Sequence, residues 1–414
     1  MLDIKFIRDN LALVKESLKK RCSTVRPEDL LDLDAKRVSL IQKIEALRKE
    51  RNELSRQLSA ISRQRGKEIK EELKLLEPEL AAFETELRNA LSEVPNIVLS
   101  QVPVGKSEQD NKVLKHVGEQ PHFSFTPLDH LALAEKHDLL DFERGAKVVG
   151  SQFYYVKNDL VLLEQALVQF AFTFLVKKGF IPVATPDVAK SRYYLGTGYN
   201  PKGPEAQTYT LEGEDLGLIA TAEVTLAGLH ADEILDSKQL PIKYVGISHC
   251  FRKEAGAYGR YSKGLYRVHQ FTKVEMFVFC LPGQSEKMHE ELLEIETEFY
   301  KNLEIPFRVV EMCSADLGAQ AARKFDLEAW MPGRGDFGEI TSTSNTTDYQ
   351  ARQLNIKYRP GHGQTAFVHT LNGTVLTSSR TPIALLENMQ EEDGTIRIPK
   401  VLQKYFGKKK IGEK

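Results

Sequence analysis

Residues 250–275 read CFRKEAGAYGRYSKGLYRVHQFTKVE, and the short apolar, β-branched stretches on either side predict a strand–loop–strand hairpin. Its glycines allow tight backbone turns, and its arginines can bind phosphate through paired hydrogen bonds. Arg252, Phe271 and Glu275 could then hold a phosphate, stack on a base and face a small polar second substrate. A surface hairpin with solvated charges explains the same composition, so the other motifs must decide between this alternative and a nucleotide-binding hairpin.

The composition of the 414-residue chain excludes several protein classes. A formal net charge of −1 gives no general attraction to polyanions, so a nucleic-acid contact would need a local basic patch. The cysteines lie far apart without a Cys-x-x-Cys motif, which argues against a disulfide framework or a zinc site and fits a reducing cytoplasm. The first residues show no signal-peptide pattern, and the longest apolar run, around residues 166–176, is too short to span a bilayer. We therefore expect a cytoplasmic protein without a membrane segment.

Residues 1–105 carry a helical pattern that predicts a small cap followed by an antiparallel helical hairpin. Apolar residues recur at heptad spacing over residues 33–94, with one break between residues 62 and 67, where we place the turn. Pro78 lies inside the second helix and predicts a bend there, because proline removes a helical hydrogen bond. We expect the hairpin to form a separate domain that ends at residue 105.

The polar face of the first helix of this hairpin carries more basic than acidic residues. A basic surface on a nearly neutral protein could bind RNA phosphates. Two alternatives are a solvated coiled-coil face, which needs charges in any case, and a coiled coil that pairs two subunits. For an RNA contact the candidate residues are Arg48, Lys49, Arg51, Arg56 and Arg63.

Residues 106–414 alternate short apolar runs with longer helical ones, which predicts an α+β domain with an antiparallel or mixed sheet. Residues 160–178 form a helix so apolar that the sheet or another subunit must cover it. The tripeptide Thr221-Ala222-Glu223 precedes another helical stretch. Its hydroxyl and carboxylate could bind an ammonium group or simply cap that helix.

Residues 333–338 fit the pattern G-x-G-x-x-G, but we reject a dinucleotide site because neither a proper strand before them nor a helix after them is predicted. Glu339 and Ser342 could instead present a carboxylate and a hydroxyl from one face to Mg²⁺ on a triphosphate. Pro382 suits the start of a helix, at whose N-terminus Arg380 could bind a γ-phosphate. A surface arginine in a solvated cap is the alternative.

Together these motifs resemble the class II aminoacyl-tRNA synthetases, and among them the seryl-tRNA synthetase family. The resemblance covers nearly the whole chain, from the Met-Leu-Asp-Ile-Lys opening through the helical hairpin. The strand at Pro186 looks like the first class motif, residues 251–275 like the second, and Arg380 with its helix like the third. It implies an antiparallel-sheet catalytic domain over residues 106–414 behind a coiled-coil arm. Thr374 departs mildly from the family, where serine is frequent, but it keeps a hydroxyl.

The resemblance also implies the roles of individual residues. Arg252, Glu339 and Arg380 would be catalytic, and Glu339 and Ser342 would hold Mg²⁺ with ATP. The residues implied for serine binding are Thr221, Ala222, Glu223, Arg252, Glu275, Asn372 and Thr374. The residues implied for ATP binding are Arg252, Lys253, Glu254, Val268, His269, Gln270, Phe271, Glu339, Ile340, Thr341, Ser342 and Arg380.

The implied activity is a serine–tRNA ligase that forms seryl-adenylate from L-serine and ATP and passes the seryl group to the 3′ end of tRNA(Ser). tRNA(Sec) is a further candidate acceptor. The resemblance implies a homodimer, with the apolar helix 160–178 at its interface. One alternative is an arm-bearing paralogue that adenylates a small amino acid for an acceptor other than tRNA, and another is a non-catalytic relative. A class I synthetase is excluded, because the His-Ile-Gly-His and Lys-Met-Ser-Lys-Ser signatures are absent from the sequence.

Overall fold

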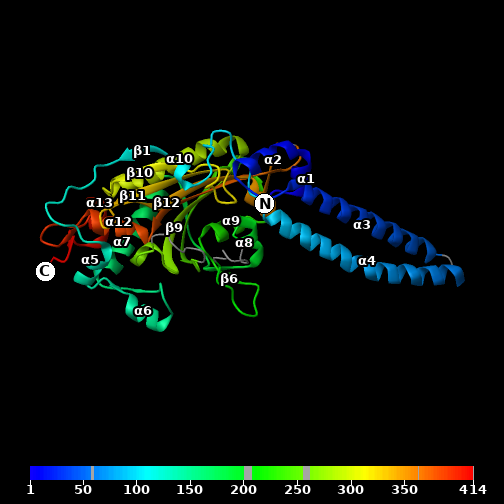
Figure 1. The fold of residues 1–414 in the computed structure, drawn as a ribbon, viewed down its shortest axis with the longest axis horizontal. Coiled ribbons are helices and arrows are strands. Elements are labelled where there is room, and N and C mark those ends of the chain that lie inside the picture. The colour runs from blue at the N-terminus through cyan, green and yellow to red at the C-terminus, as the bar shows by residue number, and fades with distance from the viewer. Residues whose placement is uncertain (57–59, 200–207, 255–261, 362, 414) are drawn as a thin grey trace. The chain divides into compact units, whose positions relative to one another are not determined.

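The computed structural model describes residues 1–56, 60–199, 208–254, 262–361 and 363–413 (Figure 1). Contacts within the chain divide it into two compact units, Met1–Ile97 and Val98–Lys414. The helical pattern of the sequence predicted a boundary after residue 105 instead. Residues 98–105 belong with the second unit because Val98 and Val102 pack into a cluster with Val310 and Met312.

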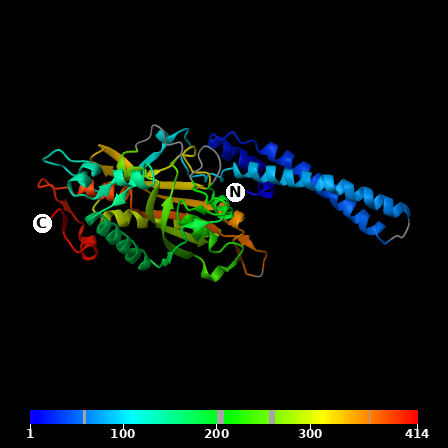
Figure 2. The same cartoon turned by 90° about the horizontal axis from the view of Figure 1, so that it is seen from below.

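The first unit is entirely helical in its described part. Asp3 caps the first helix by accepting a hydrogen bond from the Phe6 amide at 2.7 Å, and Pro27 opens the third helix at a position where proline is favoured. Figure 2 shows the two long helices running alongside each other. The helices are α1 (Ile4–Asp9), α2 (Leu11–Lys20), α3 (Pro27–Leu54) and α4 (Ala60–Ser92).

The predicted helical hairpin is confirmed, with a buried seam between α3 and α4. Ile44, Leu47, Ile69 and Leu73 form the centre of this seam. Two ion pairs join the helices outside it, from Arg48 to Glu77 and from Arg65 to Glu50, each at 2.8 Å. Since exposed ion pairs contribute little, the apolar seam supplies most of the stabilisation.

The predicted position of the turn is wrong. Helix α3 ends at Leu54 and α4 begins at Ala60, so Gly66 lies inside α4, and so does Arg63, which we had placed on the first helix. A mid-helix glycine costs about 1 kcal/mol relative to alanine, which packing in the seam offsets. Ile61, read as a heptad position, is 83% exposed. Helix α4 continues through Pro78, and Figure 1 shows its direction changing between its two halves.

The second unit is built on an eight-stranded sheet, as predicted for an α+β domain. Its strand order is β1-β10-β11-β12-β15-β9-β8-β4, and every neighbouring pair is antiparallel except β4 and β8. In that order the strands are β1 (Lys112–Val117), β10 (Phe307–Glu311), β11 (Arg323–Met331), β12 (Asp336–Thr347), β15 (His369–Thr377), β9 (Gln270–Cys280), β8 (Ile242–Phe251) and β4 (Ile181–Ala184).

Short strands and helices surround this sheet. The helices are α5 (His130–Lys136), α6 (Phe142–Val148), α7 (Asp159–Val176), α8 (Ser191–Thr197), α9 (Glu223–Gly228), α10 (Ser285–Asn302), α11 (Tyr349–Leu354), α12 (Arg380–Asn388) and α13 (Lys400–Phe406). The small strands are β2 (Leu140–Asp141), β3 (Tyr155–Val156), β5 (Val188–Ala189), β6 (Gly217–Leu218), β7 (Ile234–Asp236), β13 (Lys357–Arg359), β14 (Ala366–Phe367), β16 (Ile396–Arg397) and β17 (Lys410–Ile411).

These elements test two expectations about local structure, one for residues 250–275 and one for residues 333–338. The hairpin predicted from residues 250–275 is confirmed, because β8 and β9 pair antiparallel with Cys250 opposite Phe271. The glycines at 256 and 259 lie outside the described residues. The prediction that no strand precedes residues 333–338 is wrong, because β11 runs to Met331 and β12 starts at Asp336. These residues therefore turn a β-hairpin and precede no helix, so the dinucleotide motif remains rejected.

Helix α7 is the apolar helix expected at residues 160–178. Leu163, Leu167 and Phe170 on one face lie in the main core cluster, and the helix packs against α13 and the sheet. With 18 residues and a mean hydropathy of 1.6 it is long and apolar enough to cross a membrane, contrary to our reading of the sequence. A core helix has the same length and composition, and its buried face fits that role.

Candidate active site

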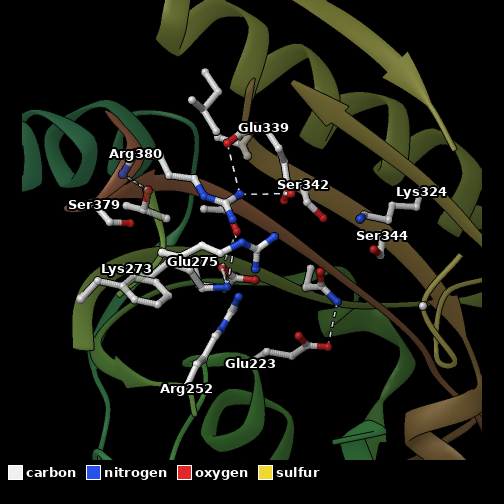
Figure 3. A pocket seen from close by; sticks show the side chains of 18 of the residues that line it. Glu223, Arg252, Lys273, Glu275, Lys324, Glu339, Ser342, Ser344, Ser379 and Arg380 are labelled. Atoms are coloured by element: carbon white, nitrogen blue, oxygen red, sulfur yellow. Dashed lines mark hydrogen bonds and ion pairs between the residues drawn. The ribbon is translucent and has the colours of Figure 1, made fainter. Parts of the chain in front are cut away.

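A polar cavity of about 220 Å³ opens above the middle of the sheet. It lies between the β8–β9 hairpin, strands β12 and β15, and the first residue of α12 (Figure 3). Thirteen predicted site residues line it: Glu223, Arg252, Glu254, Val268, Phe271, Glu275, Glu339, Ile340, Thr341, Ser342, Asn372, Thr374 and Arg380. Segments more than 150 residues apart in sequence thus meet in one site.

The metal-binding candidates share one face of β12 because the strand contains a bulge. Leu327 of β11 lies opposite Thr341, whereas the next residue, Glu328, lies opposite Glu339, so Ile340 is an extra residue. In a regular strand, residues three apart point to opposite faces. The extra residue restores a common face, and both Glu339 and Ser342 line the cavity.

Glu339 lies between cations. Nη1 of Arg380 is 3.1 Å from its Oε2 and also donates to its backbone oxygen at 3.1 Å. Burial acts to raise the pKa of Glu339, but Arg380 and Lys324 outweigh burial and lower that pKa to about 2. The carboxylate is therefore ionised at any physiological pH. Arg380 is held in place because its guanidinium stacks 4.7 Å from the centre of the Tyr266 ring.

Arg252 and Phe271 are adjacent across the β8–β9 pair. The guanidinium of Arg252 lies 5.2 Å from the centre of the Phe271 ring, and its Nε donates to the Ala220 carbonyl at 3.3 Å. In the described part of the chain Arg252 forms no ion pair with a carboxylate, so its charge is available to an anion. Glu254, in contrast, forms an ion pair with Arg267, whose Nη1 lies 2.8 Å from Oε2 of Glu254.

At the other end of the cavity, Glu223 is held by neutral donors. Its carboxylate accepts hydrogen bonds from Tyr199 at 3.0 Å, from Gln350 at 2.7 Å and from Asn372 at 2.8 Å. Burial and the nearby Glu275 carboxylate raise the pKa of Glu223 to about 7. No cation pairs with it among the described residues. Such a carboxylate is suited to an incoming ammonium group.

Glu275 forms a buried cluster with residues beside it. Its Oε2 is 2.6 Å from Nζ of Lys273 and accepts a hydrogen bond from Thr374 at 3.1 Å. Both members of this ion pair are at most 6% exposed. In Figure 3 Lys273 and Glu275 lie together between Arg252 and Arg380.

The residues that sequence reasoning missed include Tyr199, Lys273 and Lys324, which line the cavity, and Gln350, which bonds to Glu223. Lys273 lies two residues from Glu275 on the same strand, so the period-2 rule for strands was a signal that could have found it. Tyr199 and Gln350 come from the end of α8 and from α11, where nothing local in the sequence marks them.

Five predicted residues do not line the cavity. Thr221 and Ala222 are buried outside the lining, and the Thr221 hydroxyl accepts a hydrogen bond from the Glu223 amide at 3.2 Å. The N-cap residue of α9 is Ala222, which makes no side-chain capping bond. Lys253 stacks 5.5 Å from the Tyr209 ring, and His269 lies 2.8 Å from the Tyr209 hydroxyl. Gln270 lines a second, smaller cavity behind Phe271.

The five candidate RNA-binding residues of the first unit are all exposed. Arg48 and Arg51 lie on α3, Arg56 lies just after it, and Arg63 lies on α4. Their exposure is compatible with a phosphate contact and equally with a solvated face.

Two family models match the chain. Residues 1–98 match the seryl-tRNA synthetase N-terminal domain, and residues 208–389 match the class II tRNA synthetase core domain (G, H, P, S and T). The chain is 52% identical to a serine–tRNA ligase of Dictyoglomus thermophilum and 51% identical to one of Treponema denticola, each time over 100% of both chains.

Solved structures agree with these relatives. The chain is similar to the seryl-tRNA synthetase of Pyrococcus horikoshii complexed with ATP, with a TM-score of 0.88 and 42% identity over 99% of both chains. It is also similar to the cytoplasmic serine–tRNA ligase of Naegleria fowleri in complex with AMP, with a TM-score of 0.83 and 36% identity over 99% of this chain and 98% of that one.

Proposed function

The chain belongs to the serine–tRNA ligase family of class II synthetases, and from this premise we propose how its cavity activates serine. As a member of that family it is a ligase that uses ATP, serine and tRNA. The alternative of a paralogue with a non-tRNA acceptor is not favoured, because full-length relatives at about half identity are serine–tRNA ligases. The residue roles that follow are proposals.

ATP would bind at the end of the cavity that carries the arginines. Phe271 would stack on adenine, with Val268 beside it, and Arg252 would bind the α-phosphate. Arg380 would bind the γ-phosphate, and this phosphate would compete with Glu339 for the guanidinium of Arg380. The support for this placement is that Arg252 has no carboxylate partner among the described residues, while it lies against the ring that would carry the base.

Mg²⁺ fits the same end of the cavity if it arrives with ATP. Glu339 is ionised and Ser342 adds a hydroxyl from the same face, and oxygen atoms are the ligands that Mg²⁺ prefers. No cluster of three or more acidic, histidine or cysteine side chains occurs in the described ranges, so the phosphates would have to supply further ligands. When bound, the ion would offset negative charge on the phosphate oxygens.

Serine would bind at the Glu223 end. Its ammonium group would pair with Glu223, whose three present partners are neutral. Its hydroxyl would bond to the Glu275–Thr374 pair, which lies 3.1 Å apart. A site that hydrogen-bonds a hydroxyl rejects the analogue lacking it, because its own buried groups are left unpaired. Threonine would be excluded by the size of the pocket.

The reaction then brings two anions together. The serine carboxylate attacks the α-phosphorus, the bond to pyrophosphate breaks, and seryl-adenylate forms. Arg252 and Arg380 would neutralise the repulsion between carboxylate and phosphate, and the fixed cavity would supply the orientation. A hydroxyl of the tRNA 3′-terminal adenosine would then attack the seryl carbonyl and release AMP. The observation that carries this proposal is the single cavity that joins an unpaired carboxylate to a cationic end.

The acceptor tRNA would contact the first unit through Arg48, Lys49, Arg51, Arg56 and Arg63. The support is their exposure and the match of residues 1–98 to the family's N-terminal domain. tRNA(Ser) is the proposed acceptor, with tRNA(Sec) as a second candidate. We propose a cytoplasmic location, the compartment of tRNA charging.

We also propose a homodimer through α7 and β4. Val161 and Leu162 on α7 and Ile181 on β4 are 40–50% exposed apolar side chains, and β4 is an edge strand of the sheet. Exposed apolar side chains on an edge are a common feature of subunit interfaces. The mass of the intact protein in solution, compared with that of a Leu162→Asp variant, tests this interface.

Serine-dependent pyrophosphate exchange tests the proposed activation step. The assay should be run with each of the twenty amino acids, and we expect serine alone to support rapid exchange. Charging of total tRNA with serine then tests the acceptor. Exchange without tRNA charging would favour the paralogue, and exchange with another amino acid would overturn the assignment of the Glu223 pocket.

A further inference from the structure

Helix α10 carries three polar side chains on the face that packs against the sheet. His289, Glu296 and Tyr300 are spaced by seven and four residues, which places them on one side of the helix. All three are at most 1% exposed. We call this set the polar ridge. Helix α10 contacts β12 and β15, the two strands that carry the proposed metal and serine residues.

Each member of the polar ridge bonds to a residue in the cavity lining or next to it in sequence. Nε2 of His289 lies 3.1 Å from the Thr343 carbonyl, and Glu296 accepts a hydrogen bond from the Thr341 hydroxyl at 3.1 Å. The hydroxyl of Tyr300 bonds to that of Thr381 at 2.8 Å, one residue after Arg380. The ridge thus connects to β12 and to the start of α12 from behind the cavity.

Glu296 is the unusual member. It is fully buried, and no cation pairs with it in the described part of the chain. Burial raises its pKa well above the ordinary value, and Glu275 and Asp326 act in the same direction, while Thr341 and Lys273 act against it. Burial thus favours the neutral form of this side chain, and its Oε1 has no hydrogen-bond partner among the described residues.

The free oxygen of Glu296 points at the backbone of β15. A Cβ atom added at Gly373 would lie 2.9 Å from Oε1 of Glu296 and 3.1 Å from the Thr343 hydroxyl. Gly373 lies between Asn372 and Thr374, and it pairs with Thr343 across the sheet. The absence of a side chain at 373 makes room for the carboxyl group directly beneath the proposed serine pocket.

We propose that Glu296 is a positioning residue for both substrates. Through Thr341 it holds the segment of β12 that presents Glu339 and Ser342, and beside Gly373 it supports the segment of β15 that presents Asn372 and Thr374. This inference rests on the proposed function. Glu296 touches neither substrate, so its effect should appear in substrate binding and depend on the hydrogen bond to Thr341.

Pyrophosphate exchange with purified full-length variants tests the proposal. Glu296→Gln keeps the size, the neutral charge and an oxygen that accepts from Thr341, whereas Glu296→Leu removes the acceptor. We expect Glu296→Gln to stay within about twofold of wild type, and Glu296→Leu to raise KM for serine and for ATP by about tenfold with a smaller change in kcat. Thr297→Val is the matched control, because Thr297 is a buried neighbour on α10 whose hydroxyl has no partner in the described structure.

Thr341→Val provides a second, gentler test of the same bond. It should raise both KM values as Glu296→Leu does, and the double variant should be no worse than the more severe single one, since both remove one interaction. A lower Tm with unchanged KM values in these variants would make Glu296 merely structural and overturn the proposal. If Glu296→Leu does not fold, KM for serine in Thr341→Val decides, because Thr341 itself is implied for ATP binding and only its effect on serine is indirect. Failure of the proposed function is distinguishable, because wild type itself would then show no serine-dependent exchange.

Discussion

Glu223 and Glu339 are two carboxylates at opposite ends of one cavity, and their electrostatic environments are opposite. Arg380 and Lys324 hold the pKa of Glu339 at about 2, whereas burial and Glu275 raise that of Glu223 to about 7. Glu339 therefore keeps its charge under all ordinary conditions. Glu223 keeps its charge at neutral pH only in part, and a cationic ligand would stabilise it.

From this difference we infer which substrate group each end of the cavity would bind. Glu339, which is ionised and paired with Arg380, would be available as an oxygen ligand to a metal that arrives with ATP. Glu223, held by Tyr199, Gln350 and Asn372, has no counter-charge among the described residues, and the serine ammonium group would provide one. The following predictions test this contrast, beginning with the largest expected effect.

Replacing Arg380 should affect the reaction most. Arg380→Ala should lower the rate of pyrophosphate exchange by roughly 10²–10³-fold, because a charge that stabilises the transition state is lost. Steady-state exchange kinetics provide the measurement. Arg334→Ala is the matched control, since Arg334 also stacks on Tyr266, at 5.8 Å, but does not line the cavity. Equal losses in the two variants would contradict the role of Arg380.

Glu223→Gln should raise KM for serine by about 10²-fold with little change in KM for ATP. Removing one partner of a buried charge pair costs about 2–5 kcal/mol, and a factor of 10² corresponds to about 2.7 kcal/mol, within that range. Glu311→Gln is the control, because Glu311 is a buried carboxylate paired with Arg323 outside the cavity. An unchanged KM for serine would show that the ammonium group binds elsewhere.

The pH dependence should separate the two ends of the cavity. Below pH 7 Glu223 takes up a proton and loses its charge, so serine binding weakens as pH falls. We expect KM for serine to rise about tenfold between pH 8 and pH 6, whereas Glu339, with a pKa of about 2, stays charged and contributes no change. In Glu223→Gln the rise should disappear. A rise that persists in this variant would assign the titration to another group.

Tyr199→Phe should give the smallest effect. It removes one hydrogen bond to Glu223 and should raise KM for serine about fivefold, which corresponds to about 1 kcal/mol. Tyr194→Phe is the matched control, because the Tyr194 hydroxyl bonds to the Gly217 carbonyl away from the cavity. If the two variants have the same KM, Tyr199 does not position Glu223.

The sequence predicted the elements of this fold better than their ends. The β8–β9 hairpin and the helical hairpin of the first unit have strong periodic patterns, and the existence of both was predicted correctly. The turn between α3 and α4 was misplaced because a glycine at 66 looks like a break, while packing against the neighbouring helix keeps it helical. The end of β11 was missed because Trp330, Met331 and Pro332 read as a loop.

The candidate site also contains residues that the sequence predicted and residues that it did not. Residues that belong to a contiguous motif, such as Arg252, Glu275 and Arg380, were found and lie in the cavity. Tyr199 and Gln350 reach Glu223 from distant segments, so only the folded chain reveals them. The bulge at Ile340 was also invisible, although the common face of Glu339 and Ser342 depends on it.

That bulge limits which length changes the chain tolerates during evolution or engineering. Deleting Ile340 alone would straighten β12 and turn Glu339 toward the opposite side of the sheet, away from Arg380, while Ser342 stayed in place. A shortened variant of this kind would keep Glu339, Ser342 and Arg380 and still lose their arrangement. An alignment that scores residue identity alone would rate it as intact.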